Sequence, residues 1–131
     1  MSQKVVLASQ FSDSTGCYNG NNLNDGGYYY AELSTNPKDP IEKLDYKALG
    51  GLKKFHELKI TYNGKSVIAK KGDVGRGKLE TSGEFKGELR KIDLHKKTAN
   101  YLEFNGLDHV TIEDVWLLKL SIIHGYVKFI V

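Results

Sequence analysis

Alternating apolar and polar positions predict a chain of short β-strands, and the clearest pattern lies in residues 57–70. Two alternating segments flank Asn63-Gly64 there. Asn-Gly is a strong hairpin signal because a type I′ turn needs positive φ at both central residues. A two-residue turn pairs Tyr62 with Lys65 and sets the register of the segments. The face that this register can bury holds Leu58, Ile60, Val67 and Ala69.

Four other segments have the composition of strands, which makes six with the hairpin. They are apolar, aromatic or alternating runs bounded by turn residues. Residues 12–27 and 78–87 are rich in turn formers and predict long surface loops, and the glycines of residues 72–77 favour a bend. The four segments are Lys4 to Phe11, Tyr28 to Leu33, Leu89 to Ile92 and His109 to Val115.

Two stretches have helical spacing. Asp39-Pro40 precedes apolar residues at helical positions and predicts a short helix or helical turn that ends at Gly50-Gly51. Asp93 occupies a capping position before a second helical face that ends near residue 105. The apolar and small residues of that second face are Leu94, Thr98, Ala99 and Leu102.

Residues 116–131 are apolar, with His124-Gly125 in their middle. Lys119 and Lys128 make this stretch a poor membrane segment, so we expect an extra C-terminal hairpin and no membrane span. An exposed apolar hairpin would also suit a homodimer interface.

Composition narrows the class of protein. With 131 residues, 40% hydrophobic and 27% charged, the chain is expected to form one globular domain over residues 1–131. The net charge of +3 permits an anionic polymer as partner, whereas the scattered lysines do not indicate nucleic acid. Cys17 is the one cysteine, so no intrachain disulfide is expected, and no spacing predicts a metal site or a cofactor.

Three blocks of sequence resemble the double-psi β-barrel superfamily of rare lipoprotein A, expansins and barwin-like endoglucanases. The blocks lie between Val5 and Val115, so residues 116–131 fall outside the resemblance. The last block is the most specific. In order, the blocks are Ala8-Ser9-Gln10-Phe11, residues 60–67 running into Lys71-Gly72-Asp73-Val74-Gly75, and Lys91-Ile92-Asp93-Leu94 followed by Thr98-Ala99-Asn100-Tyr101-Leu102.

The resemblance implies an all-β, six-stranded double-psi β-barrel with one or two short helices and an open groove for polysaccharide. It implies a cell-wall glycan as partner, with peptidoglycan the first choice, and Asp93 as the general acid. In the lytic transglycosylases of the superfamily, this carboxyl protonates the glycosidic oxygen and the 6-hydroxyl of the sugar attacks. No cofactor is implied.

Two further aspartates match the superfamily. Asp73 corresponds to an aspartate near the groove that is thought to bind or orient the glycan. Asp13 has the offset of the general base in inverting endoglucanases, whose two carboxyls lie roughly 6.5–9.5 Å apart. Those enzymes are usually rich in disulfides, and the lone Cys17 weighs against that type.

Five more residues are candidates for substrate binding. Ser9 and Phe11 belong to the first block, in which Phe11 replaces the usual Tyr. An exposed ring of the tyrosine run, such as Tyr29, could stack on a sugar, although core packing is the stronger interpretation. Arg76, like Arg90, could contact acidic groups of a wall polymer, and His95 lies two residues from Asp93 and could shape its field.

Simpler interpretations stand beside these. Asp93 could only cap a helix, Asp73 could only serve a turn, and Asp13 could lie in a solvated loop. The chain could accordingly be an expansin-like module that loosens wall polymers, an inverting hydrolase, or a structural or interaction domain. The first residues have too short an apolar run for a signal peptide. An extracellular or periplasmic location is expected if a leader is removed, and the compartment is otherwise open.

Overall fold

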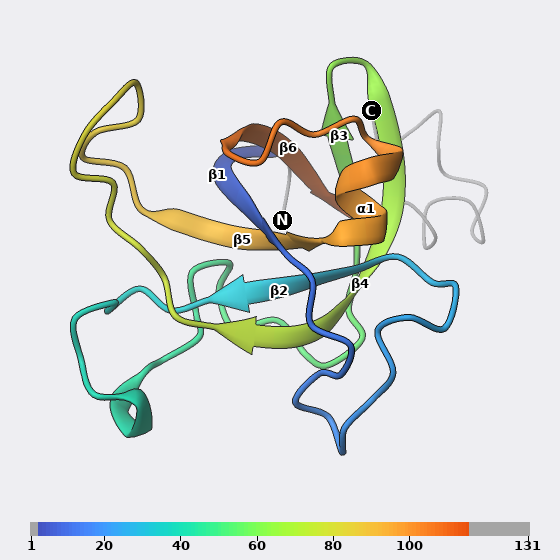
Figure 1. Cartoon of the computed structure of the whole chain (residues 1–131), viewed down its shortest axis with the longest axis horizontal. Helices are drawn as coiled ribbons and strands as arrows, with labels where there is room; N and C mark the ends of the chain where they lie inside the picture. The colour runs from blue at the N-terminus through green and yellow to red at the C-terminus, as the bar shows by residue number, and fades with distance from the viewer. Residues whose placement is uncertain (1–2, 116–131) are drawn as a thin grey trace, which may run out of the picture.

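Six strands close into a barrel in the computed structural model, which describes residues 3–115 (Figure 1). Around the barrel the strands follow the order β1-β5-β2-β4-β3-β6. This confirms the predicted all-β class and the closed six-stranded barrel. The strand bounds are β1 Lys4–Phe11, β2 Tyr29–Leu33, β3 Glu57–Tyr62, β4 Lys65–Gly75, β5 Arg90–His95 and β6 Asp108–Asp114.

The predicted hairpin is confirmed in its turn and in its register. Asn63 and Gly64 have φ of 47° and 80°, as a type I′ turn requires. Tyr62 pairs with Lys65, and the pairing continues through Ile60–Val67 and Leu58–Ala69. All four apolar side chains of the predicted face are buried.

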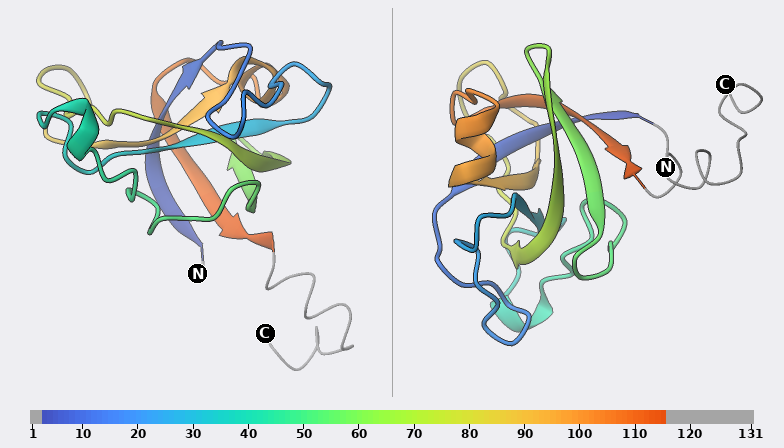
Figure 2. Two further views of the ribbon diagram at one scale, coloured as in Figure 1. Left: turned by 90° about the horizontal axis from the view of Figure 1, so that it is seen from below. Right: turned by 90° about the vertical axis from the view of Figure 1, so that its right-hand side faces the viewer.

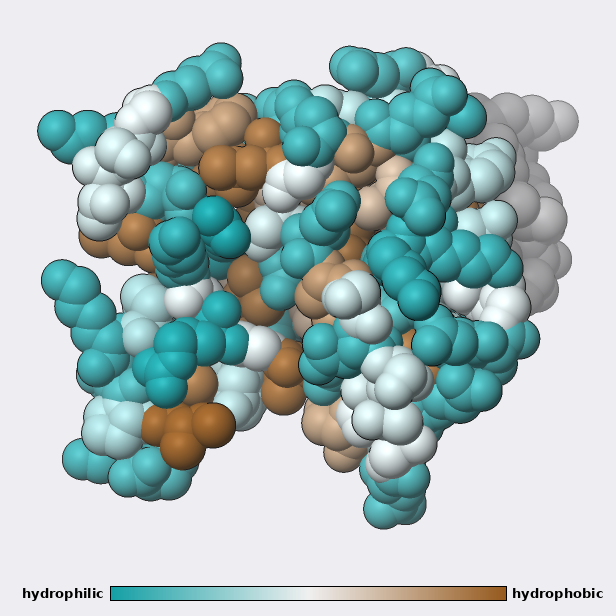
Figure 3. Space-filling model, in the orientation of Figure 1, coloured by the Kyte–Doolittle hydropathy of each residue, from teal (hydrophilic) through white to brown (hydrophobic). Residues whose placement is uncertain are grey.

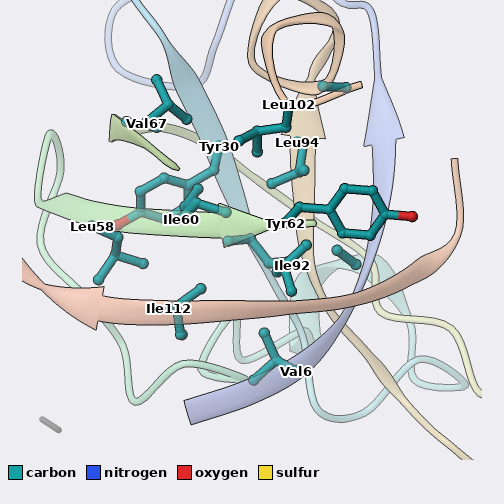
Figure 4. Close-up of a cluster of buried hydrophobic side chains, with 14 of the residues drawn as sticks. Val6, Tyr30, Leu58, Ile60, Tyr62, Val67, Ile92, Leu94, Leu102 and Ile112 are labelled. Carbon is teal, nitrogen blue, oxygen red and sulfur yellow. The ribbon is translucent and has the colours of Figure 1, made fainter. Parts of the chain in front are cut away.

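The barrel interior is filled by the inward-facing residues of all six strands (Figure 4). Every second side chain of a strand lies on the same face, and β3 shows this as a strict alternation of buried and partly buried residues. All five residues of β2 are buried, because loops and α1 (Lys96–Tyr101) also cover parts of the outer face. On β6, the predicted inward pair Val110 and Ile112 is buried. Others in this core are Val6, Tyr30, Leu58, Ile60, Val67, Ile92 and Leu94, with Leu102 from beyond α1.

The predicted bend at residues 72–77 is wrong, because β4 continues to Gly75. Its second half pairs in parallel with β2, and the register shifts between Tyr30 and Ala31. Gly72 is required for close packing and not for a bend. A Cβ on Gly72 would lie 2.7 Å from Leu23 Cδ2 and 2.8 Å from the Tyr29 ring.

The interpretation of Asp93 as a helix cap is also wrong. β5 continues to His95 because it pairs with β1 on one side and β2 on the other. The following helix, α1, has His95 at its N-cap, with no side-chain capping bond. The segment after Pro40 forms a single 3-10 turn, η1 (Ile41–Lys43), and no apolar helical face.

Three loops matter for the site. The first part of the loop of residues 34–56, with η1, and the loop of residues 76–89 project from the same end of the barrel (Figures 1 and 2). The second part of the loop of residues 34–56 runs back against β2 and β4, where the Leu49 N–H donates to Glu32 and the Phe55 N–H donates to the Lys71 carbonyl. The loop of residues 12–27 is anchored to β4, since Asn21 Nδ2 donates to the Gly72 carbonyl at 3.0 Å and Leu23 is fully buried.

Among residues 3–115 no helix has the length and apolarity to cross a membrane. The predicted C-terminal hairpin and its homodimer surface lie outside the described residues.

Candidate functional site

Four residues from four strands form one row across the outside of the barrel. Ser9 on β1 pairs with Asp93 on β5, and Asp93 pairs with Ala31 on β2. Ala31 pairs in turn with Asp73 on β4. Paired residues place their side chains on the same face, so two predicted aspartates and the predicted Ser9 share one surface.

Ala31 separates the two carboxyls of this row. Neighbouring strands lie about 4.8 Å apart, so the α-carbons of Asp93 and Asp73 are about 10 Å apart with the Ala31 methyl between them. A larger side chain at this position would fill the gap. The row therefore has a carboxyl on each side of Ala31.

Asp93 is half-buried, and this burial raises the pKa of its carboxyl above 3.8. The Ser9 hydroxyl donates a hydrogen bond to Asp93 Oδ1 and, like the nearby charge of Arg90, lowers that pKa. The charges of Asp13 and Asp73 raise it further. Burial is the largest of these effects, and the balance favours a carboxyl that keeps its proton to a higher pH than a solvated aspartate.

Asp73 is also half-buried, and desolvation raises its pKa. Its Oδ1 accepts the N–H of Val74 at 2.9 Å, and the thiol of Cys17 donates to the same carboxylate. Because both bonds favour the charged form, they counteract the effect of burial. Asp73 is thus held by β4 and by the loop of residues 12–27 together.

Asp13 lies on that loop just after β1 and is exposed. Its backbone carbonyl lies 2.8 Å from Nε2 of His95, which is fully buried. The structure therefore places His95 beneath the loop that carries Asp13. The Phe11 ring packs edge-on against the His95 ring, with 5.2 Å between the ring centroids.

A pocket of about 470 Å³ lies beside Asp93, between the loops that project from the end of the barrel. Figure 3 shows this face of the molecule hollowed at the same side. Asp93 and Ser9 lie at its floor, and Leu33 and Leu79 give it apolar walls. The rest of the lining is Pro37, Lys38, Arg76, Gly77, Lys78, Thr81 and Arg90.

Arg76 is held in the pocket wall by the opposite loop. Its Nη1 donates to the carbonyls of Pro37 at 2.7 Å and Asp39 at 2.6 Å. Arg90 instead forms an ion pair with Glu80 at 2.8 Å. The predicted Arg76 therefore lies in the same pocket as Asp93, whereas Asp73 and Asp13 are not part of its lining.

Tyr29 does not present an exposed ring. It is 7% exposed, packs against Gly72 and donates its hydroxyl to Asp25 Oδ2 at 2.7 Å. Burial, followed by the bond to Asp25, raises the pKa of Tyr29 to about 12. Its position between the sheet and the loop of residues 12–27 makes it a packing residue.

Several residues of the site had no signal in the sequence. Ala31 is marked only by the strand register, and Lys38 and Lys78 lie in loops whose approach depends on the tertiary fold. The thiol of Cys17 contacts Asp73 across 56 positions of sequence. Within residues 3–115 no cluster of three or more His, Cys, Asp or Glu side chains is arranged to hold a metal ion.

Comparisons with known proteins identify similarity at the level of structure and no family. No family model matches the chain, and no curated protein matches it. Among solved structures, the chain is similar to Streptomyces papain inhibitor (SPI), with a TM-score of 0.47 and 15% sequence identity. That alignment covers 85% of this chain and 92% of the inhibitor.

Proposed function

We propose that this chain binds and cleaves a cell-wall glycan, with peptidoglycan as the first candidate and Asp93 as the general acid. The observation that carries the proposal is the half-buried carboxyl of Asp93 at the floor of a pocket open to solvent, with its pKa raised by burial. A general acid must hold its proton near the working pH, and burial favours the protonated form.

The arrangement of strands supports a double-psi β-barrel as the fold behind this function. The closed barrel contains two parallel pairs, β1 with β5 and β2 with β4, joined by the antiparallel pair of β2 and β5. Asp93 and Asp73 lie at equivalent places, each directly opposite Ala31. This places both residues of the sequence resemblance on one surface.

The chemistry that best fits this site is that of a lytic transglycosylase. Asp93 donates its proton to the glycosidic oxygen, and the bond from that oxygen to the anomeric carbon breaks. The 6-hydroxyl of the same sugar forms a new bond to the anomeric carbon and returns its proton to Asp93. One carboxyl is sufficient for this cycle, while Asp73 orients the glycan as a hydrogen-bond acceptor.

Inverting hydrolysis is a second candidate, because the charge of Asp13 acts on both Asp93 and Asp73. In this alternative Asp13 activates a water and Asp93 remains the acid. The inverting reaction needs space for that water between the carboxyls, which an exposed loop residue such as Asp13 allows.

The test is incubation with purified peptidoglycan and mass spectrometry of the products. We expect anhydro-muropeptides from the native chain, none from Asp93→Asn, and unchanged products from Glu42→Gln, an exposed residue on η1. Anhydro products that persist in Asp93→Asn would overturn the assigned acid. New reducing ends that disappear in Asp13→Asn would identify the hydrolase, and binding to insoluble wall without products would identify a non-catalytic, expansin-like module.

A further inference from the structure

The pocket beside Asp93 has an excess of positive charge. Four cationic side chains line it, against the single carboxyl of Asp93. The pairing of Arg90 with Glu80 leaves three cations, and none of these three has an ion-pair partner among residues 3–115. They are Lys38, Arg76 and Lys78. If Asp93 holds its proton, as the proposed function requires, nothing in the pocket lining balances their charge.

The pocket and its neighbour lack aromatic side chains. A second hollow of about 370 Å³ shares Pro37, Lys38 and Leu79 with the first, so the two are adjacent, and its own lining adds the carboxylate of Asp39. Within the described part of the chain, the apolar lining of both is aliphatic, from Leu33, Pro37, Leu79 and Leu89. Stacking of sugars on rings is therefore not available there, and the charges are the main means of recognition.

Arg76 presents a free edge of its guanidinium group. Its Nη1 donates to two backbone carbonyls, which fixes the plane of the group. Its Nε and Nη2 have no partner among residues 3–115, so one edge with two parallel N–H donors remains. Such an edge matches the two oxygens of a carboxylate in a bidentate pair.

We propose that this pocket is a carboxylate subsite, in which Arg76 binds a carboxylate carried by the glycan close to the bond that is cleaved, with Lys38 and Lys78 adding to the attraction. The proposal rests on the proposed function for the identity of the polymer as a glycan. It makes Arg76 a specificity-determining residue, because a neutral polysaccharide bound in the pocket would remove water from its charged edge without supplying a partner.

The test measures binding and not cleavage, in the Asp93→Asn variant. Calorimetric titration compares soluble peptidoglycan glycan strands, the same strands with their carboxyls converted to amides, neutral chitin oligosaccharides and polyphosphate. We expect amidation to weaken binding roughly tenfold or more, since a charge-assisted bidentate pair is lost. We also expect the affinity for the intact strands to fall as salt rises.

Variants separate bidentate binding by the Arg76 guanidinium group from general electrostatic attraction. Arg76→Gln should lower the affinity for the intact strands but not for the amidated ones. Arg76→Lys should lower the affinity for the intact strands less, because lysine keeps the positive charge but lacks the two parallel N–H donors. Since Arg76 also holds the loop of residues 37–39, Lys38→Gln and Lys78→Gln provide a second test. Lys54→Gln, an exposed residue that lines neither hollow, is the matched control.

Equal affinity for intact and amidated strands would overturn the subsite, and tighter binding of polyphosphate than of glycan carboxylates would overturn the carboxylate assignment. Both outcomes are distinct from failure of the proposed function. Cleavage of peptidoglycan together with carboxylate-independent binding would overturn only the proposed subsite. Carboxylate-dependent binding without cleavage by the native chain would overturn only the proposed enzymatic activity.

Discussion

The carboxylate of Glu32 and the ammonium group of Lys71 lie 2.8 Å apart inside the barrel, and both side chains are buried. Glu32 also accepts the backbone N–H groups of Leu49, Gly51 and Leu52, each at 2.8 Å. Lys71 donates to the Leu52 carbonyl at 2.6 Å. The pair therefore joins β2 and β4 to the loop that covers this end of the barrel.

Removal of the cation from this pair should destabilise the fold strongly. Lys71→Met leaves the carboxylate of Glu32 buried without a counter-charge, which costs about 3–5 kcal/mol in comparable buried pairs. Urea denaturation measures the change in the free energy of unfolding. Lys70→Met, at the exposed neighbouring position of β4, is the control and should change it little. Equal losses in both variants would show that the pair contributes nothing.

The hairpin could be predicted from sequence because its turn, its register and its buried face all lie within residues 57–70. The site could not be completed in the same way. Ser9 and Asp93 are 84 positions apart and meet only through the parallel pairing of β1 and β5. A buried pair such as Glu32 and Lys71 gives no local signal, because charged residues in a strand usually mark its solvent face.

The predicted bend at residues 72–77 and the interpretation of Asp93 as a helix cap are wrong for the same reason. A glycine serves a bend or a close contact, and an aspartate serves a cap or a sheet surface, so residue type alone does not decide between them. At Gly72 the deciding contact is with Leu23, and at Asp93 it is the pairing of β5 on both sides. Both are tertiary contacts.

Ser9 should set the pH range of activity under the proposed mechanism. Its hydroxyl lowers the pKa of Asp93, so Ser9→Ala should raise that pKa further and move the alkaline limit of activity to higher pH. The pH profile of peptidoglycan cleavage measures the shift. Ser82→Ala, at an exposed position outside the pocket lining, should leave the profile unchanged. A lower alkaline limit in Ser9→Ala would contradict the proposed role.

Asp93→Asn should stabilise the fold at neutral pH. The pKa of Asp93 is raised in the folded state, so the folded chain binds more protons and its stability falls as pH rises from 3.8 through the raised value. The Asn side chain does not ionise, so the variant does not lose this stability as pH rises. Its advantage over the native chain in free energy of unfolding should disappear below pH 3.8. Urea denaturation across this range gives the comparison.

Asp45→Asn is the control of opposite sign for this experiment. Bonds from Thr35 lower the pKa of Asp45, so its carboxylate contributes stability that is lost as pH falls. Asp45→Asn should therefore destabilise the fold at neutral pH. A neutral-pH loss in Asp93→Asn like that in Asp45→Asn would show that the charged form of Asp93 is the one the fold favours.

Cys17 gives a direct chemical probe of the environment of Asp73. Burial and then the charge of Asp73 raise the pKa of the Cys17 thiol. Asp73→Asn removes that charge, so the thiol should ionise at lower pH and react faster with iodoacetamide near pH 8, because the thiolate is the nucleophile. Glu42→Gln, remote in sequence and exposed, is the control. Unchanged alkylation in Asp73→Asn would mean that the loop of residues 12–27 does not hold Cys17 beside Asp73 in solution.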